Sequence, residues 1–351
     1  MDQPIVLALD AMGGDRAPGM VLKGLNIARK RYPGVNYILF GDETKIMPGL
    51  KKFPKLIQKC EIRHTSQVVS SNDKPSTALR RARDSSMRRA IDSVRNGEAQ
   101  GIVSAGNTGA LMAIAKIVLK MVNEIDRPAI AGVFPSLRGE SVTLDLGANI
   151  ECNSENLVQF AIMGAAFARI VLGVKRPIVG LLNVGTEDLK GNESVKEASN
   201  ILKMSEQNLP FDFFGFVEGD GIGPGTADVF VTDGFTGNIA LKTAEGTAKF
   251  YSQVLKSAFR RSIFSKLGYL LAKPALTAIR KRVDPRSYNG ALFVGLNGVV
   301  VKSHGGTDAK GFANAIGVAI DMIQGGFNNE IIDDLKKIKV QNSAASDTII
   351  S

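Results

Sequence analysis

The chain has 351 residues, 44% hydrophobic and 22% charged, a composition that excludes disordered and fibrous proteins and can fill one large core or two smaller ones. Only two cysteines, Cys60 and Cys152, are present, in no metal-ligand spacing, and two histidines cannot make a metal cluster, so we expect no bound metal and a reducing compartment. No uncharged apolar run approaches the roughly 18 residues of a membrane span, because Lys116, Lys120 and Arg169 interrupt the best candidates.

The formal charge of +10 is concentrated in one segment. Residues 256–286 hold nine Lys or Arg against Asp284 alone, which leaves the rest of the chain near +2. Because no nucleic-acid reading motif or aromatic interleaving accompanies this charge, we expect no nucleic-acid partner. The charge instead indicates an anionic surface or an acidic protein partner. The N-terminus lacks the pattern of a secretory signal, so a cytoplasmic protein is expected.

Short apolar runs rich in β-formers alternate with helical patterns from the start of the chain. This alternation predicts an α/β fold with a mainly parallel sheet and flanking helices. We expect a single large domain over residues 1–340 and a flexible tail over 341–351. The expected strands are Pro4 to Leu9, Tyr37 to Phe40, Gly101 to Ser104, Ala129 to Phe134, Val142 to Leu146, Ile178 to Leu182, Val229 to Val231 and Val299 to Val301.

Between the second and third of these runs, one helix is expected from Ser76 to Arg95, with Pro75 at its start and Gly97 as its stop. The helix carries six arginines against Asp84 and Asp92. Such a run is usually a solvated face.

Glycine-containing loops follow six of the apolar runs. In an open α/β sheet we expect all six at the carboxyl edge, where ligands bind. Glycine lets the backbone approach a ligand closely, and a helix that starts after it offers N–H groups to an anion. The loop at 104–109, followed by a helical pattern, suits a phosphate best. The six loops are 10–15 (DAMGGD), 104–109 (SAGNTG), 145–149 (DLGAN), 183–187 (NVGTE), 233–238 (DGFTGN) and 303–308 (SHGGTD).

Several common catalytic signatures are missing from the sequence. It has no strand-linked G-x-G-x-x-G, no P-loop and no G-x-S-x-G. The sequence therefore lacks the usual motifs of dinucleotide-dependent redox enzymes, P-loop NTPases and serine hydrolases. Cys152 precedes a predicted helix and could act as a thiol nucleophile, but a small packed cysteine is favoured because no histidine is near it in sequence.

Several of these motifs resemble those of a known family, the phosphate acyltransferases of bacterial phospholipid synthesis (the PlsX family). The resemblance runs in order from about residue 5 to residue 323. Two stretches depart from the family pattern. One is 218–221 (EGDG), and the other is 289–293 (NGALF), where the family usually has a Gly-Gly-Ala run. The motifs that carry the resemblance are ALDAMGGD (8–15), KPSTALR (74–80), DSSM (84–87), SAGNTGA (104–110), RPA (127–129), DLGAN (145–149), DVFVTDGFTGNIALK (228–242) and SHGG (303–306).

The resemblance implies an isocitrate/isopropylmalate-dehydrogenase-like fold shared with phosphotransacetylases, a homodimer and no organic cofactor. It also implies that acyl-carrier protein donates a fatty acyl group to inorganic phosphate, and that a downstream membrane acyltransferase consumes the acyl phosphate. Because acyl-carrier protein is acidic, the basic helix becomes a candidate docking surface through Arg80, Arg81 and Arg88.

A thioester is already activated and phosphate brings its own nucleophilic oxygen, so such an enzyme must chiefly orient the two and stabilise an oxyanion. The predicted phosphate site is Gly106, Asn107, Thr108 and Gly109. For charge stabilisation we select Lys242 and His304, with Asp233 and Asn238 orienting them or the donor. His304 as a hydrogen-bonded turn residue and Lys242 as a solvated helix residue remain the structural alternatives.

Residues 256–286 are predicted to form a protruding helical hairpin, with Pro274 ending the first helix and starting the second. An apolar stripe ringed by basic residues indicates contact with an anionic membrane, and we therefore expect peripheral association with the inner face of the membrane. The alternative is a buried helix or a dimer contact. The stripe consists of Ile263, Leu267, Leu270 and Leu271, with Phe264 beside it.

Three other functions remain open at this point. A phosphotransacetylase-like enzyme that uses acyl-coenzyme A presents the same pantetheine arm to its site. A non-catalytic protein of the membrane surface would bind a phosphorylated ligand without turnover. A decarboxylating dehydrogenase follows from fold analogy alone.

Overall fold

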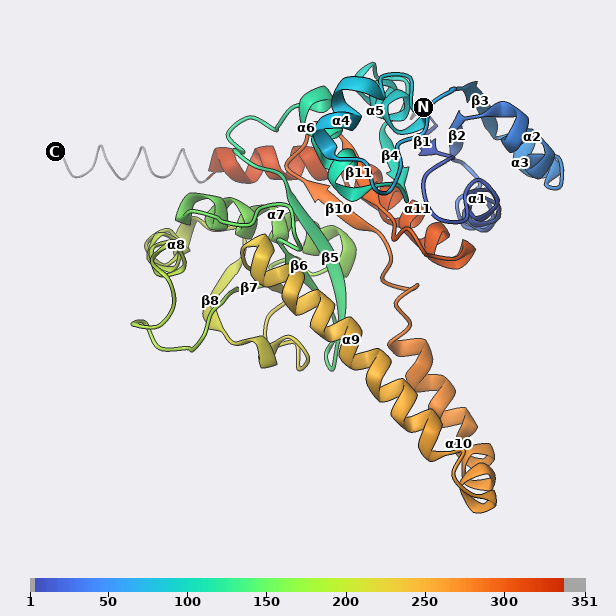
Figure 1. Cartoon of the computed structure of the whole chain (residues 1–351). Coiled ribbons are helices and arrows are strands. Elements are labelled where there is room, and N and C mark those ends of the chain that lie inside the picture. The colour runs from blue at the N-terminus through green and yellow to red at the C-terminus, as the bar shows by residue number, and fades with distance from the viewer. Residues whose placement is uncertain (1–3, 338–351) are drawn as a thin grey trace.

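A computed structural model describes residues 4–337, which build an eleven-stranded sheet flanked by helices (Figure 1). The tail predicted at 341–351 lies outside the described residues. The strands are β1 (Val6–Asp10), β2 (Asn36–Gly41), β3 (Cys60–His64), β4 (Gly101–Ser104), β5 (Ala129–Ser136), β6 (Gly139–Leu144), β7 (Ile178–Leu182), β8 (Asp212–Val217), β9 (Val229–Val231), β10 (Ala291–Val294) and β11 (Val299–Lys302).

The strand order is β3-β2-β1-β4-β11-β10-β5-β6-β9-β7-β8. Both flanks of this order pair in parallel, whereas β10 is antiparallel to its neighbours β11 and β5, and β5 is antiparallel to β6. The predicted α/β class with a mainly parallel sheet is confirmed. Three expected strands, β4, β7 and β9, coincide with the observed bounds, and β3, β8 and β10 were not expected.

Helices cover both faces of the sheet and bury two apolar layers. One layer packs α1 (Gly19–Arg31), α7 (Ser154–Leu172) and α11 (Ala309–Gln324) against residues such as Leu9 and Val301. The other packs α5 (Ser86–Arg95) and α6 (Thr108–Leu119) against Ala8, Ile102 and Val300. The remaining helices are α2 (Glu43–Leu50), α3 (Pro54–Ile57), α4 (Pro75–Arg81), α8 (Glu193–Met204), α9 (Gly234–Ala258) and α10 (Ile263–Arg282), with short 3-10 turns η1 (Glu206–Asn208) and η2 (Gly219–Gly221).

Within the described residues, one helix, α7, is long and apolar enough by composition to cross a membrane. In the fold, 61% of its most apolar window is buried. Its Arg169 pairs with Glu330 and with Asp334 near the C-terminal end of the described chain. We conclude that α7 is a central core helix.

The basic helix expected from Ser76 to Arg95 is two helices, α4 and α5, so that prediction is wrong. The chain turns at 82–85, and the Ser85 hydroxyl caps α5 by accepting the N–H of Arg88 at 3.2 Å. A serine cap competes with helix continuation, because its side chain satisfies an N–H that the preceding turn cannot. The basic residues are therefore divided between two helix directions.

Helices α9 and α10 project from the body as a hairpin (Figure 1). The prediction that Pro274 separates its helices is wrong, because Pro274 lies inside α10. The turn falls at 259–262, where the Ser262 hydroxyl caps α10 by accepting the N–H of Ser265 at 3.0 Å. The hairpin consequently begins at Gly234, well before the expected residue 256, and the apolar stripe follows its tip directly.

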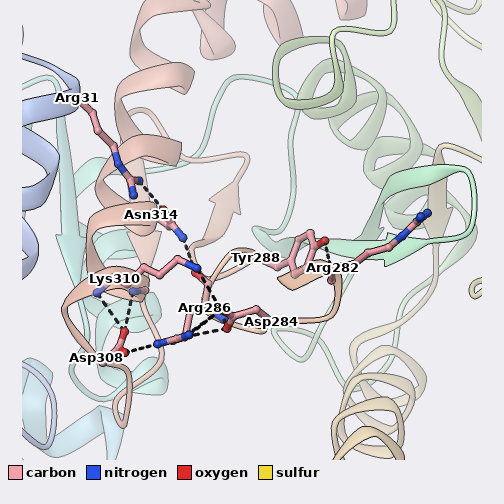
Figure 2. A network of polar contacts seen from close by, with 9 residues as sticks. Arg31, Arg282, Asp284, Arg286, Tyr288, Asp308, Lys310 and Asn314 are labelled. Carbon is pink, nitrogen blue, oxygen red and sulfur yellow. Dashed lines mark hydrogen bonds and ion pairs between the residues drawn. The ribbon is translucent and has the colours of Figure 1, made fainter. Parts of the chain in front are cut away.

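A network of ion pairs fixes the segment that leads from α10 back to the sheet (Figure 2). Arg286 pairs with Asp284 at 2.8 Å and with Asp308, the N-cap of α11, at 2.9 Å. Lys310 adds a contact to Asp284 at 3.1 Å. Hydrogen bonds to Arg286 and Lys310 hold the pKa of the Asp284 carboxyl well below its usual range. The root of the hairpin is thus tied to the glycine loop at 303–308.

The antiparallel pairs divide the six glycine loops. Strands β1, β4 and β11 are parallel to one another, whereas three successive antiparallel pairings give β6, β7 and β9 the opposite direction. The expectation that all six loops share one edge is therefore wrong. Three loops, 10–15, 104–109 and 303–308 (the β1–β4–β11 loops), leave one edge, and the loops at 145–149, 183–187 and 233–238 (the β6–β7–β9 loops) leave the other.

Candidate active site

The β1–β4–β11 loops converge on one another. The N–H of Asp15 donates to the carbonyl of Gly305 at 3.0 Å, which joins the first loop to the third. At Gly13 an added Cβ would lie 2.5 Å from Asp10 Oδ2 and 2.8 Å from the N of Gly106, so only glycine allows the first loop to approach the second this closely. The three loops therefore form one continuous surface at the ends of β1, β4 and β11.

Beneath this surface lies the buried carboxylate of Asp10, the last residue of β1. Its Oδ1 accepts the hydroxyl of Ser86 at 2.6 Å, and its Oδ2 accepts the hydroxyl of Ser104 at 2.7 Å. Burial raises the pKa of Asp10, and the two serine hydroxyls oppose that shift. The same Ser104 oxygen accepts the N–H of Gly106 at 3.0 Å, so the carboxylate organises the start of the 104–109 loop.

Asn107 and its neighbours begin helix α6. The side-chain oxygen of Asn107 caps the helix by accepting the N–H of Ala110 at 3.0 Å. Its amide donates to the carbonyls of Ser70, Ser71 and Asp73 at 2.9–3.1 Å, so this side chain is occupied in holding the backbone. The exposed Thr108 and Gly109 occupy the first turn, where N–H groups have no partner within a helix and point outward.

His304 lies exposed in the third loop, with a backbone fixed by Asn289. The Asn289 side chain accepts the N–H of His304 at 2.9 Å and donates to Ser303 Oγ at 2.8 Å and to the carbonyl of Gly311 at 2.7 Å. The Nδ1 atom of His304 accepts the N–H of Gly306 at 3.1 Å, which leaves Nε2 as the nitrogen available to a ligand.

At the opposite edge, Asp145 organises the 145–149 loop. Its buried carboxylate accepts five hydrogen bonds at 2.7–3.1 Å, from the backbone N–H groups of Ile130, Gly147, Ala148 and Asn149 and from the Asn149 amide. Burial raises the pKa of Asp145 and these donors oppose the shift. An added Cβ at Gly237 would lie 1.9 Å from the Asp145 carbonyl, so α9 can pack on this loop only with glycine there.

The other predicted catalytic residues lie on this second edge. Asp233 caps α9 by accepting the N–H of Thr236 at 2.7 Å and its hydroxyl at 3.0 Å. Asn238 is exposed on the first turns of α9 and lies next to Gly147. The exposed Lys242 pairs with Glu245 at 2.9 Å. These three residues share the start of α9, but the fold does not bring them to the edge that carries Asn107 and His304.

The predicted docking arginines differ in exposure. Arg80 and Arg81 are exposed at the end of α4, whereas Arg88 is partly buried and pairs with Asp92 at 3.1 Å. The predicted membrane residues are all on α10 and are strongly exposed: Phe264 (82%), Leu267 (58%), Leu270 (62%) and Leu271 (78%).

Metal and thiol chemistry find little support in residues 4–337. No group of three or more His, Cys, Asp or Glu side chains in that range could hold a metal ion. Burial, together with the nearby carboxylates of Asp145 and Asp233, raises the pKa of the Cys152 thiol to about 12. A thiol with such a pKa stays protonated near neutrality and is a poor nucleophile.

Two residues of the first edge were not predicted from the sequence. Lys302 ends β11 as a buried lysine, and its only sequence signal is a charge that closes an apolar strand. Asn289 belongs to the stretch at 289–293 that departs from the family pattern, and that departure was the available signal.

Comparison with known proteins gives matches over nearly the whole chain. The family described as fatty acid synthesis protein matches residues 5–330. The phosphate acyltransferase of Rhodospirillum centenum is 58% identical over 346 residues, covering 99% of this chain and 97% of that protein. The phosphate acyltransferase of Paramagnetospirillum magneticum is 56% identical over 339 residues, covering 97% of this chain and 96% of that protein.

Solved structures share the fold at low sequence identity. The EutD phosphotransacetylase of Staphylococcus aureus has a TM-score of 0.59 at 18% identity and covers 91% of this chain and 94% of its own. A phosphotransacetylase of Streptococcus pyogenes has a TM-score of 0.60 at 17% identity, with the same coverage. The expected relation of the fold to phosphotransacetylases is confirmed.

Proposed function

Because this chain belongs to the family of fatty acid synthesis proteins that includes the phosphate acyltransferases, we propose that it transfers a fatty acyl group from acyl-carrier protein to inorganic phosphate. The product is an acyl phosphate for phospholipid synthesis. The observation that carries this proposal is identity above 50% to phosphate acyltransferases over nearly the full length. The donor and the product are the parts that need experiment.

The proposed reaction requires few catalytic side chains. A phosphate oxygen attacks the thioester carbonyl, a C–O bond forms and the C–S bond breaks, and the pantetheine thiolate leaves. The thiolate needs little acid assistance because its pKa is near that of a free cysteine. Backbone N–H groups at the start of α6 offer a preformed anion site, and His304 Nε2 lies in the neighbouring loop.

The decisive assay measures free carrier thiol after incubation with palmitoyl-acyl-carrier protein. Release should require inorganic phosphate and yield a hydroxylamine-reactive product. Equal release without phosphate indicates a thioesterase and contradicts the proposal. A comparison with palmitoyl-coenzyme A tests the donor, because equal use of both donors favours a phosphotransacetylase-like enzyme.

Two groups of variants decide which edge of the sheet carries the reaction. Thr108→Pro removes an N–H from the first position of α6, where proline is tolerated and the preceding Asn107 is already extended. His304→Ala removes the exposed imidazole. Each should lower kcat/KM by about 10²-fold if the β1–β4–β11 loops hold the transition state. Lys242→Ala tests the other edge. Near wild-type turnover in Lys242→Ala assigns the chemistry to the first edge, and the opposite result assigns it to the second.

We place the carrier-docking surface on the exposed arginines at the end of α4. Arg80→Glu with Arg81→Glu should raise KM for the carrier more than it lowers kcat, most clearly at low salt. Lys51→Glu with Lys52→Glu is the matched control, since both lysines are exposed and make the same charge change beyond α2. An equal effect of both double variants indicates general repulsion of the acidic carrier.

We place the contact with an anionic membrane at the tip of the hairpin. Ile263 and Phe264 follow the turn and are 78% and 82% exposed, and Arg260 and Arg261 lie within it. Shallow apolar burial with basic flanks gives reversible, salt-sensitive binding. We propose that the protein is cytoplasmic and attached peripherally through this contact, which would deliver a water-insoluble acyl phosphate to a downstream membrane acyltransferase.

Sedimentation with phosphatidylglycerol vesicles tests the tip. Leu267→Glu with Leu271→Glu should stay in the supernatant while retaining soluble activity. Ala275→Glu with Ile279→Glu adds the same charges to exposed positions nearer the root and should still pellet. If the first pair instead produces monomers or unfolded protein, the stripe is structural.

The proposed homodimer uses the exposed apolar positions of α9. Ile239 (49%), Phe250 (61%) and Val254 (49%) lie along that helix, where no described element covers them. Phe250→Asp should shift the mass measured by light scattering from dimer to monomer. A dimer that survives this substitution places the interface elsewhere.

A further inference from the structure

Three neighbouring parallel strands end in a row of buried polar side chains. Lys302 of β11 is in register with Ser104 of β4, and the Ser104 hydroxyl donates to Asp10 of β1 at 2.7 Å. Side chains alternate along a strand, so all three point to the face that α5 and α6 cover. The apolar residues two positions earlier on these strands belong to the layer beneath those helices: Ala8, Ile102 and Val300.

Lys302 is the member of this row with unused bonding capacity. Its residue is 9% exposed, and within residues 4–337 its ammonium group donates only to the main-chain carbonyl of Ser303, with no carboxylate at ion-pair distance. An ammonium group has three donors, and burying it without a counter-charge is costly. Asp10 lies in the same row, but its carboxylate accepts the hydroxyls of Ser86 and Ser104 and lies beyond ion-pair distance of the Lys302 ammonium group.

Charge at this lysine is maintained by its surroundings. Burial lowers the pKa of Lys302 to about 8, and the carboxylates of Asp10 and Asp15 oppose that shift. The adjacent strands β4 and β10 carry no titratable side chain, and α6 carries only Lys116, exposed near its far end. The arginines of α5 and Lys310 of α11 each pair with an aspartate. Lys302 is therefore charged at neutral pH, and the cations on α5 and α11 already have carboxylate partners.

We propose that Lys302 is a catalytic residue that binds the phosphate substrate through its ammonium group, at the ends of β4 and β11 beside the first N–H groups of α6. This assignment rests on the proposed function for its substrate. A phosphate dianion supplies both the missing counter-charge and the acceptor oxygens, and α6 begins directly after β4. Lys302 keeps its proton while the phosphate oxygen attacks the thioester and the thiolate leaves.

Phosphate binding in the absence of any acyl donor tests the assignment by calorimetry at pH 7. Lys302→Met should weaken binding by about 10- to 100-fold, the range for one hydrogen bond to a charged group. Lys302→Arg should retain most of the affinity. Lys116→Met is the matched control, because it removes an equal charge from the exposed side of α6 and should bind as wild type. Wild-type affinity in Lys302→Met overturns the proposal.

The pH profile separates a direct contact from a merely structural role. Wild-type affinity should fall above pH 8 as Lys302 loses its proton, whereas Lys302→Arg stays charged and should hold its affinity to higher pH. The same decline in both proteins contradicts the proposal, and this comparison stands even if Lys302→Met fails to fold.

Two further measurements identify the ligand and distinguish failure of the phosphate site from failure of the proposed function. If Lys302→Met loses affinity for 4′-phosphopantetheine and keeps it for inorganic phosphate, the ligand is the donor arm and the proposal is wrong. If wild type binds phosphate through Lys302 and releases no carrier thiol, the proposed function fails and the phosphate site stands. In an active enzyme, Lys302→Met should raise KM for phosphate more than it lowers kcat.

Discussion

Asp10 and Asp145 occupy similar places in the fold and do different work. Each is a buried aspartate where a strand ends, one at β1 and the other just after β6, and burial raises the pKa of both. Asp145 accepts five hydrogen bonds, four of them from backbone N–H groups. Asp10 accepts two side-chain hydroxyls and one longer bond, at 3.3 Å, from the N–H of Met12, and it shares its row with Lys302.

The difference shows how a buried carboxylate can be either a clamp or part of a binding site. The backbone N–H groups that donate to Asp145 fix the conformation of its loop. A ligand could not displace any of them without unfolding that loop. The two shortest bonds to Asp10 come from side chains of α5 and β4, next to a lysine with free donors. The β1–β4–β11 edge therefore keeps hydrogen-bond donors that a ligand can use, whereas the hydrogen bonds of Asp145 are made within its own loop and its neighbours.

The largest expected effect is on stability at the clamp. Asp145→Ala leaves four backbone N–H groups buried without an acceptor and should lower the free energy of unfolding by about 3–5 kcal/mol. Urea denaturation followed by circular dichroism measures it. Ser66→Ala, which removes an exposed 3.2 Å hydrogen bond to Asp84, is the control and should change little. A loss below about 1 kcal/mol for Asp145→Ala would contradict the clamp.

The division of the two edges was beyond the reach of sequence reasoning. The strands themselves were readable because β4, β7 and β9 are compact apolar runs between turn residues. Their directions were not, because the reversal depends on β10 and on the β5–β6 hairpin. Gly139, with φ of 140°, turns that hairpin, and the short run of β10 carries no alternating pattern.

The second expected effect concerns ligand binding at the other carboxylate. Asp10→Asn keeps the shape and removes the negative charge that favours the charged form of Lys302, so the pKa of that lysine should fall below about 8. Phosphate affinity should drop roughly tenfold at pH 8 and much less at pH 6.5. Calorimetry at the two pH values measures it, and an equal loss at both would indicate a structural effect of Asp10.

Part of the candidate site was visible in the sequence. The cap and first turn of α6 at 107–109 followed from a glycine loop between a strand and a helical pattern. Lys302 was not visible, since a lysine at a strand end usually lies in solvent, and only the register with Ser104 and Asp10 buries it. The tip of the hairpin was predicted at the wrong residue, because Pro274 does not end the helix and the Ser262 cap starts it.

A smaller effect is expected at Asn289, which positions the 303–308 loop without reaching the ligand. Asn289→Ala removes three hydrogen bonds to that loop and to α11, and should lower kcat/KM by about tenfold and the unfolding free energy by about 1–2 kcal/mol. Asn297→Ala is the matched control, because its 2.6 Å bond to the Met121 carbonyl lies before the start of β11, at the end of that strand opposite the 303–308 loop. Equal kinetic losses in both variants would remove the positioning role.

The smallest expected effect is at Cys152, which lies near Asp145 and away from the β1–β4–β11 loops. Its thiol has a pKa raised to about 12 by burial and by the carboxylates of Asp145 and Asp233, so it is protonated throughout the neutral range. Thiolate, the nucleophilic form, appears only as the pH approaches that value. Cys152→Ala should therefore keep kcat within about twofold between pH 7 and 8, and iodoacetamide should leave wild-type turnover unchanged. Mass spectrometry of the protein quenched during turnover completes the test. An acyl group found on Cys152, together with loss of activity in Cys152→Ala, would move the chemistry to the β6–β7–β9 loops and reverse the assignment of the two edges.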